Sequence, residues 1–368
     1  MYWDSVSTAP ASPALPSRVP RAAEAAQFLR ERLLGGTWPK FLPGELELAR
    51  QLQVGRNTLR SALAMLEKEG LLKTQMGRRR EVVGSITTAA KPTPHTAVLL
   101  LGMPYHTLAP TTLLWMETLR LRLQGAGWDL KMKVDSAAFR HSPATALETL
   151  VSEQPEAVWI LHRSTLAMQR WFETRGLKAV IAGTQHQGIS LPQVDTDYRA
   201  SSRHAAARLA ALGHRHMLLM TSRVELAGDA ESVAGFQEGA GQAKVEVVTH
   251  NETPAGVIAT LRHALEARPR PTALFVLRAD HLATAQTWLL AQGYGIPAQI
   301  SVISRDDEPF LQHLHPEPAR YQRSAEVFAK KLARLVTACG EGRSLRTDSP
   351  LLMPDFLRGE TVGPAPQR

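Results

Sequence analysis

Five arginines near the N-terminus have the spacing to bind phosphate groups. Arg56 and Arg60 lie one helical turn apart, and three consecutive arginines, residues 78–80, follow Gly77. A guanidinium group donates hydrogen bonds in a planar fork that fits a phosphate or the edge of a guanine base. Three adjacent positive charges repel one another unless an anion relieves the repulsion. These residues therefore indicate a polyanionic partner.

The segment around these arginines has the pattern of a compact helical unit. Between Pro43 and Val83 it predicts two short helices, a turn, a longer helix and a β-hairpin. A short helix begins near Glu45, and Val54 with Gly55 supplies the turn. In the longer helix, apolar residues recur at helical spacing, so that one stripe packs inward. The stripe consists of Leu59, Ala62, Leu63 and Leu66.

The opposite face of the longer helix is polar and basic. It carries Asn57, Arg60, Ser61 and Ala64, with Arg56 and Thr58 at the N-terminal end. Gly55 is expected at the N-cap, and the small side chains allow a close approach to a groove of DNA. Taken alone, the helix is equally consistent with solvated surface.

A predicted hairpin after this helix favours nucleic acid over plain surface. Residues 71–75 and 81–83 have strand character around Met76 and Gly77. Phosphates would relieve the repulsion within the arginine triplet, and the minor groove attracts arginine. We therefore expect DNA contacts from both the helix and the hairpin. The predicted DNA-binding residues are Arg56, Asn57, Thr58, Arg60, Ser61, Gly77, Arg78, Arg79 and Arg80.

Residues 21–83 resemble the winged helix-turn-helix domain of the GntR family of bacterial transcription regulators. The matching residues are Leu42, Pro43, Glu45, Glu47, Leu48, Ala49, Val54, Arg56, Thr58, Leu59, Arg60, Ala62, Leu63, Leu66, Glu67, Glu69, Gly70, Leu71 and Gly77. In the family, the residues matching Arg56, Thr58, Arg60 and Gly77 approach DNA. Leu46 replaces a DNA-contacting arginine, and Gly55 replaces a serine. The resemblance therefore implies DNA binding with an unusual base preference or a lower affinity.

Composition and charge are those of a globular chain with a basic N-terminal part. The 368 residues are 44% hydrophobic and 21% charged, with a formal net charge of +9. Residues 1–90 hold 13 Lys and Arg against 8 Asp and Glu, which suits a DNA-binding domain on a less basic body. The long run without charge at residues 96–116 is interrupted by glycine and proline, so no transmembrane span is expected.

The N-terminus and the cysteine usage indicate a cytoplasmic protein. The first residues lack the apolar stretch of a signal peptide, and the single Cys339 cannot form an internal disulfide. Residues 1–20, rich in Pro, Ser and Ala, are expected to be a mobile arm. Residues 85–94 are expected to link a DNA-binding domain, residues 21–84, to a second domain, residues 95–368.

After residue 95 the pattern alternates between strands and helices. Such alternation predicts parallel sheets with crossover helices, and the remaining length is enough for two sheets, so the fold class is α/β. Ligands of parallel sheets bind outside the carboxyl ends of the strands, which makes the loops there candidate contacts. The predicted strands are residues 96–102, 129–134, 157–162, 178–182, 216–220, 244–248, 272–277 and 299–304.

From about His95 onward, the chain is similar to the effector domain of the LacI family, which has the type I periplasmic-binding-protein fold. The matching segments are residues 194–198, 206–215, 235–236, 271–273, 279–280, 295–297, 300–307 and 350–352. The resemblance implies two lobes that close on a small molecule, usually a sugar or a nucleobase, across a hinge that the chain crosses three times. It also implies a homodimer that binds an inverted repeat, most commonly as a repressor.

Five residues near the implied cleft are candidate ligand contacts. Asp280 and Asp306 match acidic positions of the family, and Asp306 ends a strand, where its carboxylate could accept paired hydrogen bonds from hydroxyls. Asp197 matches the acidic residue of a crossover and either contacts ligand or caps the following helix. Tyr105 and His106 lie in the loop after the first strand, where Tyr105 either stacks on a sugar ring or closes the cleft.

Several polar groups of the family's cleft are replaced in this sequence. Ser232 stands in place of an arginine, Ala279 in place of an asparagine and Thr184 in place of an acid. Because sugar hydroxyls need many hydrogen-bond partners, these replacements weaken the prediction of a sugar. Three residues at strand ends either replace the lost groups or belong to the surface: His162, Arg163 and Arg305.

No pattern in the sequence indicates catalysis or a metal site. His214 with His216, and His313 with His315, have suggestive spacing, but no carboxylate or cysteine nearby in sequence completes a ligand set. Nucleophile elbows, phosphate-binding glycine loops and HExxH sequences do not occur. We expect a regulator that needs no cofactor and whose partners are operator DNA, a small-molecule effector and a second copy of the chain. The alternative is a metabolite carrier or sensor that does not regulate DNA.

Overall fold

The structure is a computed structural model that describes residues 21–34, 37–38, 40–74, 80–83, 95–223, 226–343 and 351–367. The chain divides into two compact units, Met1–Thr93 and Pro94–Arg368, and each is described by itself. The expected N-terminal arm, residues 1–20, and the expected linker, residues 85–94, lie outside the described residues.

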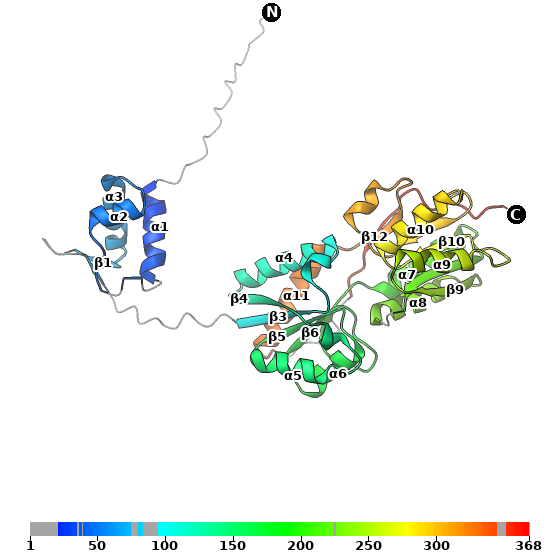
Figure 1. The fold of residues 1–368 in the computed structure, drawn as a ribbon, viewed down its shortest axis with the longest axis horizontal. Coiled ribbons are helices and arrows are strands. Elements are labelled where there is room, and N and C mark those ends of the chain that lie inside the picture. The colour runs from blue at the N-terminus through cyan, green and yellow to red at the C-terminus, as the bar shows by residue number, and fades with distance from the viewer. Residues whose placement is uncertain are drawn as a thin grey trace, which may run out of the picture. The chain divides into compact units, whose positions relative to one another are not determined.

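The first unit is built from three helices and a two-stranded ribbon (Figure 1). Its elements are α1 (Arg21–Leu34), α2 (Glu45–Gln51), α3 (Arg56–Lys68), β1 (Leu72–Lys73) and β2 (Glu81–Val82). The predicted turn is confirmed, since Gly55 is the N-cap of α3 with an extended backbone (φ −68°, ψ 152°). The expectation of two short helices after Pro43 is wrong in one respect. In the described part of that stretch α2 is the one short helix before α3, and α1 precedes both.

An apolar cluster between the three helices holds the first unit together. The predicted stripe of α3 is buried, with Leu59, Leu63 and Leu66 each at 0% exposure. It packs against α1 and α2 in a cluster that includes Leu29 and Leu48. Burying one such side chain contributes roughly 1.5–3 kcal/mol, which fixes the rotation of α3 about its axis. The polar face of α3 is therefore left exposed.

The ribbon has the two strands that the hairpin prediction required. Leu72 of β1 pairs with Val82 of β2 in antiparallel register. The amide of Leu42 donates to the carbonyl of Arg80 (3.0 Å), which anchors the ribbon beside the segment that leads into α2. The predicted contacts at the hairpin tip lie outside the described residues: Gly77, Arg78 and Arg79.

The second unit contains two sheets, which define a first and a second lobe (Figure 1). The sheet of the first lobe is parallel, in the order β4-β3-β5-β6-β7. Its strands are β3 (His95–Leu101), β4 (Trp128–Val134), β5 (Val158–His162), β6 (Ala179–Ala182) and β7 (Gln193–Val194). The sheet of the second lobe has the order β13-β12-β11-β10-β8-β9, in which β13 runs antiparallel to β12. Its strands are β8 (His216–Ser222), β9 (Lys244–His250), β10 (Ala273–Val276), β11 (Ser301–Ser304), β12 (Ala319–Gln322) and β13 (Asp355–Leu357).

All eight predicted strands are confirmed, and the sequence analysis missed β7, β12 and β13. β7 has two residues, which is too short for a hydrophobic pattern. β12 contains Arg320 and Gln322, and β13 begins with Asp355, so neither segment looks like a buried parallel strand.

Helices cover both faces of each sheet, as crossover connections require. In the first lobe, α4 (Pro110–Gly125) and α11 (Ala325–Gly340) pack on one face, and α5 (Ala144–Glu153) and α6 (Leu166–Thr174) on the other. In the second lobe, α9 (Pro254–Ala264) and α10 (Ala279–Ala291) face α7 (Tyr198–Ala211) and α8 (Ala227–Gly239) across the sheet. Short 3-10 helices are η1 (Tyr105–Thr107), η2 (Ser136–Phe139) and η3 (Pro309–His313).

The chain passes between the lobes three times. It leaves the first lobe after β7, returns after β12 to form α11, and enters the second lobe again as β13. Phe328 and Leu332 of α11 are buried in the core of the first lobe. The first and third crossings are paired, because backbone hydrogen bonds of 2.8 Å join Leu352 to both Asp195 and Asp197. The lobes therefore share a hinge of three segments.

Two glycines let α7 and α8 approach closely. A Cβ atom at Gly235 would lie 2.1 Å from the carbonyl oxygen of Arg199, and one at Gly239 would lie 2.1 Å from that of Arg203. The obstacle in both cases is helix backbone, so rotation of a side chain cannot relieve it. The separation of the two helices, and with it the position of the α8 N-terminus, depends on these glycines.

We predict that Gly235→Ala lowers the free energy of unfolding of the second unit by about 1–3 kcal/mol, the usual cost of overpacking. Gly125→Ala at the end of α4 is the matched control, because a Cβ atom there meets nothing within 4 Å. Urea denaturation of the full chain measures both effects. Equal stability of the two variants would contradict the close packing of α7 on α8.

Candidate functional site

The predicted DNA-binding residues of α3 share one exposed face of the first unit. Arg56, Asn57, Arg60 and Ser61 are exposed, and Thr58 is half-buried. Gly55 places no side chain over the first turn of α3. The free amides of that turn and the positive end of the helix dipole are therefore open to a phosphate.

One carboxylate joins this face to the ribbon. Glu45 of α2 accepts from the Arg60 Nε atom (3.0 Å) and from the Arg80 Nη1 atom (2.7 Å). Arg80 also donates to Glu67 (2.8 Å) and is half-buried, whereas the Arg60 side chain is 64% exposed. The hydrogen bond from Arg80, followed by that from Arg60, holds the pKa of Glu45 below its ordinary value. Arg80 is thus turned toward carboxylates of its own unit, while Arg60 is open to a second anion.

The Glu45 contacts predict a pH-dependent contribution to stability. Because the folded pKa of Glu45 is lowered from 4.5, its contribution is present above that value and is lost as the pH falls through the lowered pKa. We expect Glu45→Gln to cost at most about 1 kcal/mol at pH 7, as is usual for partly exposed ion pairs.

Hydrogen–deuterium exchange of peptides from the first unit measures this loss of stability without interference from the unfolding of the second unit. Glu47→Gln is the matched control, because Glu47 accepts from Gln51 and has no cationic partner in the described part of the chain. The two variants should differ at pH 7 and converge as the pH falls below the lowered pKa of Glu45. A difference that stays constant with pH would refute the assignment.

A cavity of about 770 Å³ lies between the lobes of the second unit, at the carboxyl ends of strands from both sheets. Of the predicted ligand contacts, Asp280 and Asp306 line it. Tyr105, His106 and Asp197 are not among its lining residues, although Thr107 and Leu108 of the same loop are. Asp197 caps α7, since its carboxylate accepts from the amide of Ala200 (2.8 Å), which is the structural alternative considered for this residue. All five assignments to a ligand stay predictions.

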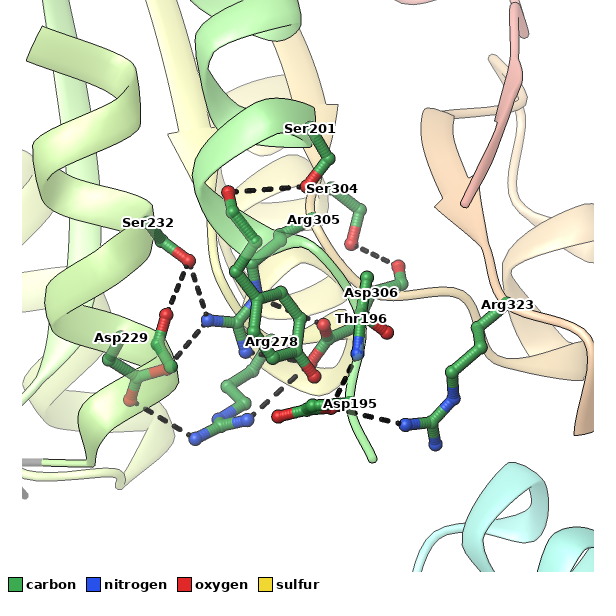
Figure 2. Close-up of polar contacts among 12 residues, drawn as sticks. Asp195, Thr196, Ser201, Asp229, Ser232, Arg278, Ser304, Arg305, Asp306 and Arg323 are labelled. Carbon is green, nitrogen blue, oxygen red and sulfur yellow. Dashed lines mark hydrogen bonds and ion pairs between the residues drawn. The ribbon is translucent and has the colours of Figure 1, made fainter. Parts of the chain in front are cut away.

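A buried arginine organises the second-lobe wall of this cavity (Figure 2). The Arg305 side chain is 1% exposed and donates from Nη1 to Asp229 (2.6 Å) and to Ser232 (3.0 Å). Its Nε and Nη2 atoms donate to the two oxygens of Asp306, at 3.0 and 3.2 Å. The Arg305 guanidinium also lies 4.2 Å from the centre of the Tyr198 ring. Arg305 therefore fills the space beside Ser232, the position at which the resemblance implies an arginine.

Arg278 completes a chain of alternating charges on the same wall. Its guanidinium lies 3.2 Å from Asp229 and 3.5 Å from Asp306, so each carboxylate lies between two arginines. Burial favours a higher pKa for Asp306, but Arg305 and Arg278 outweigh it and hold that pKa below its ordinary value. Asp306 is therefore ionised and already occupied by two donors, which limits its capacity to accept ligand hydroxyls.

The hinge carries a second buried carboxylate. Asp195 accepts from the Thr184 hydroxyl (2.7 Å) and from the amide of Thr196 (2.8 Å), and lies 3.5 Å from Arg323. Burial raises the pKa of Asp195. The resemblance implies an acidic residue at the position of Thr184. Thr184 instead contacts Asp195, an acidic residue of the first crossing. Since Arg323 follows β12, this ion pair joins the first and second crossings.

Asp229 and Arg278 were not among the residues predicted from the sequence. Arg278 lies directly after a predicted strand, so the rule that placed Asp306 at the cavity would also have found Arg278. Asp229 lies in the first turn of α8, a few residues after the end of β8, and its role appears only through its distance to Arg305. Of the residues suggested as replacements, His162 and Arg163 also line the cavity. Burial lowers the pKa of His162 to about 4, so this residue is neutral at pH 7.

Neither a metal site nor a membrane-spanning helix is present among the described residues. No group of three or more His, Cys, Asp or Glu side chains there could hold a metal ion. His214 is bound instead to Thr272 (2.8 Å) and to the carbonyl of Gly363 (3.1 Å). Within the same residues, no helix is both long enough and apolar enough to cross a membrane.

Comparison with known families defines the class of protein. Residues 21–82 match the bacterial regulatory proteins of the gntR family, and residues 206–362 match the periplasmic binding protein-like domain. The chain thus joins a domain that matches a family of bacterial regulatory proteins to a periplasmic binding protein-like domain.

The individual proteins that resemble this chain share only low sequence identity with it. The HTH-type transcriptional regulator CelR of Thermobifida fusca is 25% identical over 148 residues, which cover 39% of this chain and 44% of that protein. The chain therefore matches less than half the length of this relative. A solved CelR–cellobiose complex is 17% identical, with a TM-score of 0.64 over 87% of this chain and 100% of that one. A LacI family regulatory protein from Chloroflexus aggregans is 18% identical, with a TM-score of 0.65 over 73% of this chain and 98% of that one. At such identities the likeness establishes the fold.

Proposed function

We propose that this chain is a cytoplasmic transcription regulator that represses genes by binding an inverted-repeat operator as a homodimer. In this proposal α3 enters the major groove, and the ribbon of β1 and β2 contacts the adjacent phosphate backbone. A small molecule bound between the lobes changes operator affinity. Because the two binding free energies are coupled, the operator changes the affinity for that small molecule by the same factor.

The exposed face of α3 is the observation that carries the proposal. Its apolar stripe is committed to the core, so the rotation of the helix is fixed and one set of polar side chains faces outward. Arg56 has no carboxylate partner in the described part of the first unit, and the neighbouring Asn57 is exposed. Ala64 and Ser61 are small enough to admit the helix into a groove. Arginine and asparagine there are the side chains that recognise guanine and adenine edges.

The cavity between the lobes supports the effector part of the proposal. It lies at the carboxyl ends of parallel strands, where ligands of such sheets bind. The CelR–cellobiose complex has a similar fold and supports a sugar or a related metabolite as the effector. Asp280 is the predicted carboxylate most open to ligand hydroxyls, because its side chain is 74% exposed whereas Asp306 is held by two arginines.

The DNA contacts predict a distinctive response to mutation and salt. Arg56→Ala and Arg60→Ala should each weaken DNA binding by about 1–3 kcal/mol and reduce the slope of log affinity against log salt. Arg170→Ala is the matched control, because Arg170 is exposed on α6 in the second unit. Gel-shift titrations of the full chain across a salt series measure all three. A chain with no DNA affinity at low salt would instead be a metabolite carrier or sensor.

The homodimer predicts the symmetry of the operator. Duplexes selected by the full chain from a random library should contain two half-sites related by a dyad and bind two chains per duplex. Scrambling one half-site should reduce affinity by at least about tenfold, since each mismatched base pair costs about 1–3 kcal/mol. Analytical ultracentrifugation with labelled duplex measures the stoichiometry. Selection of single half-sites bound by one chain would exclude this mode of binding.

A further inference from the structure

Within the part of the chain that the structure describes, one arginine in the cavity between the lobes differs from the others in having no carboxylate partner. Within the described residues, the arginines that line the cavity are Arg163, Arg278, Arg305, Arg320 and Arg323. The last four each form an ion pair with an aspartate, at distances of 2.6 to 3.5 Å. Arg163 forms no hydrogen bond or ion pair with any part of the chain that the structure describes.

The backbone at Arg163 is held in an unusual conformation. Arg163 follows β5 directly and has a φ angle of 51°, in the left-handed region that residues other than glycine rarely adopt. Such conformations persist where the surrounding structure enforces them, and they cluster at ligand sites. Here the conformation accompanies a guanidinium that lines the cavity although no group among the described residues binds it.

The charges around Arg163 do not neutralise it. Burial and the positive charge of Arg278 lower the pKa of Arg163, while Asp229, Glu252 and Asp306 act in the opposite direction. Asp229 and Asp306 are already bound by Arg278 and Arg305, and Glu252 is exposed. A largely buried cation without a bound anion is costly, and neutral hydroxyl groups compensate it poorly.

We propose that the effector carries a carboxylate or a phosphate group, which Arg163 of the first lobe and Arg278 of the second lobe bind together. Arg278 can take part because its own contacts are long, at 3.2 and 3.5 Å, and leave donors free. This inference rests on the proposed effector role of the cavity. It makes the ligand a sugar acid, a sugar phosphate or a similarly charged metabolite, in contrast to a neutral sugar.

The same pair of arginines gives the anion a role in closing the cavity. Arg163 follows β5 of the first lobe, and Arg278 follows β10 of the second, so their repulsion opposes approach of the lobes. An anion between them replaces this repulsion with two attractive, charge-assisted contacts. The anion therefore binds more favourably when the lobes are closed. A ligand can change a conformation only through such a difference in affinity between two conformations.

Thermal unfolding of the full chain at constant ionic strength tests the proposal. The anionic probes are inorganic phosphate, gluconate and glucose 6-phosphate, and the neutral probes are glucose and cellobiose. At least one anionic probe should raise the Tm of the wild-type chain by about 2 °C or more at saturating concentration. The carboxylate and phosphate probes separate the two possible sources of the anion.

Variants at position 163 assign the effect to this site. Arg163→Gln should abolish the anion-dependent rise in Tm, and Arg163→Lys, which keeps the charge, should retain part of it. Arg170→Gln, an exposed arginine on α6, is the matched control and should retain all of it. Without any probe, Arg163→Gln should have a Tm equal to or above that of the wild type, because it removes an unpaired charge.

Three outcomes would overturn the inference. One is that only the neutral sugars stabilise the wild-type chain and that they stabilise Arg163→Gln to the same extent. This result would leave the proposed effector role intact. Another is an anion effect that survives Arg163→Gln, which places the anion elsewhere, for example on the DNA-binding face. The third is the absence of any shift with all five probes. The gel-shift titration tests the regulatory role independently, so failure of the ligand class and failure of the proposed function are distinguishable.

Discussion

The buried ion pairs of Arg305 determine the shape of the ligand-binding unit. This guanidinium joins the end of β11 to the first turn of α8 through Asp229 and Ser232, and it lies against Tyr198 at the start of α7. A charge with 1% exposure is tolerable only when it is paired and hydrogen-bonded, and the Nε, Nη1 and Nη2 atoms of Arg305 each donate to at least one partner. The elements that surround the cavity are therefore positioned by one residue, and the close contact of α7 with α8 at Gly235 keeps Asp229 within reach.

Arg305 and Ser232 show that a cavity can keep a charged group although the chain position that supplies it in the family's sequence motif has changed. A sequence motif assigns a charge to a chain position, whereas the cavity requires a charge at a point in space. Arg305 reaches the hydroxyl of Ser232, a residue of α8, from the end of β11, and Asp195 reaches that of Thr184 from a crossing segment. Reading the motif alone therefore suggests a loss of polar groups. The structure shows instead that the groups are supplied from elsewhere and that most of them pair with one another.

Periodic, local features could be predicted from the sequence, and features that depend on distant contacts could not. The buried stripe from Leu59 to Leu66, the N-cap at Gly55 and the eight predicted strands of the second unit all follow from spacing along the chain. β12 and β13 are recognisable only once they pair with each other. Likewise, the spacing that marked Arg80 as a DNA contact gave no sign of Glu45 and Glu67, which bind it in the folded unit.

The return of the chain to the first lobe has a consequence for synthesis on the ribosome. The core of that lobe includes Phe328, Leu332 and Val336 of α11, although its last strand, β7, ends at Val194. More than a hundred residues must be translated between these two parts of one core. The N-terminal helices, whose core is local, can fold as soon as they emerge. The nascent protein therefore completes the core of its first unit well before it can complete the core of the first lobe.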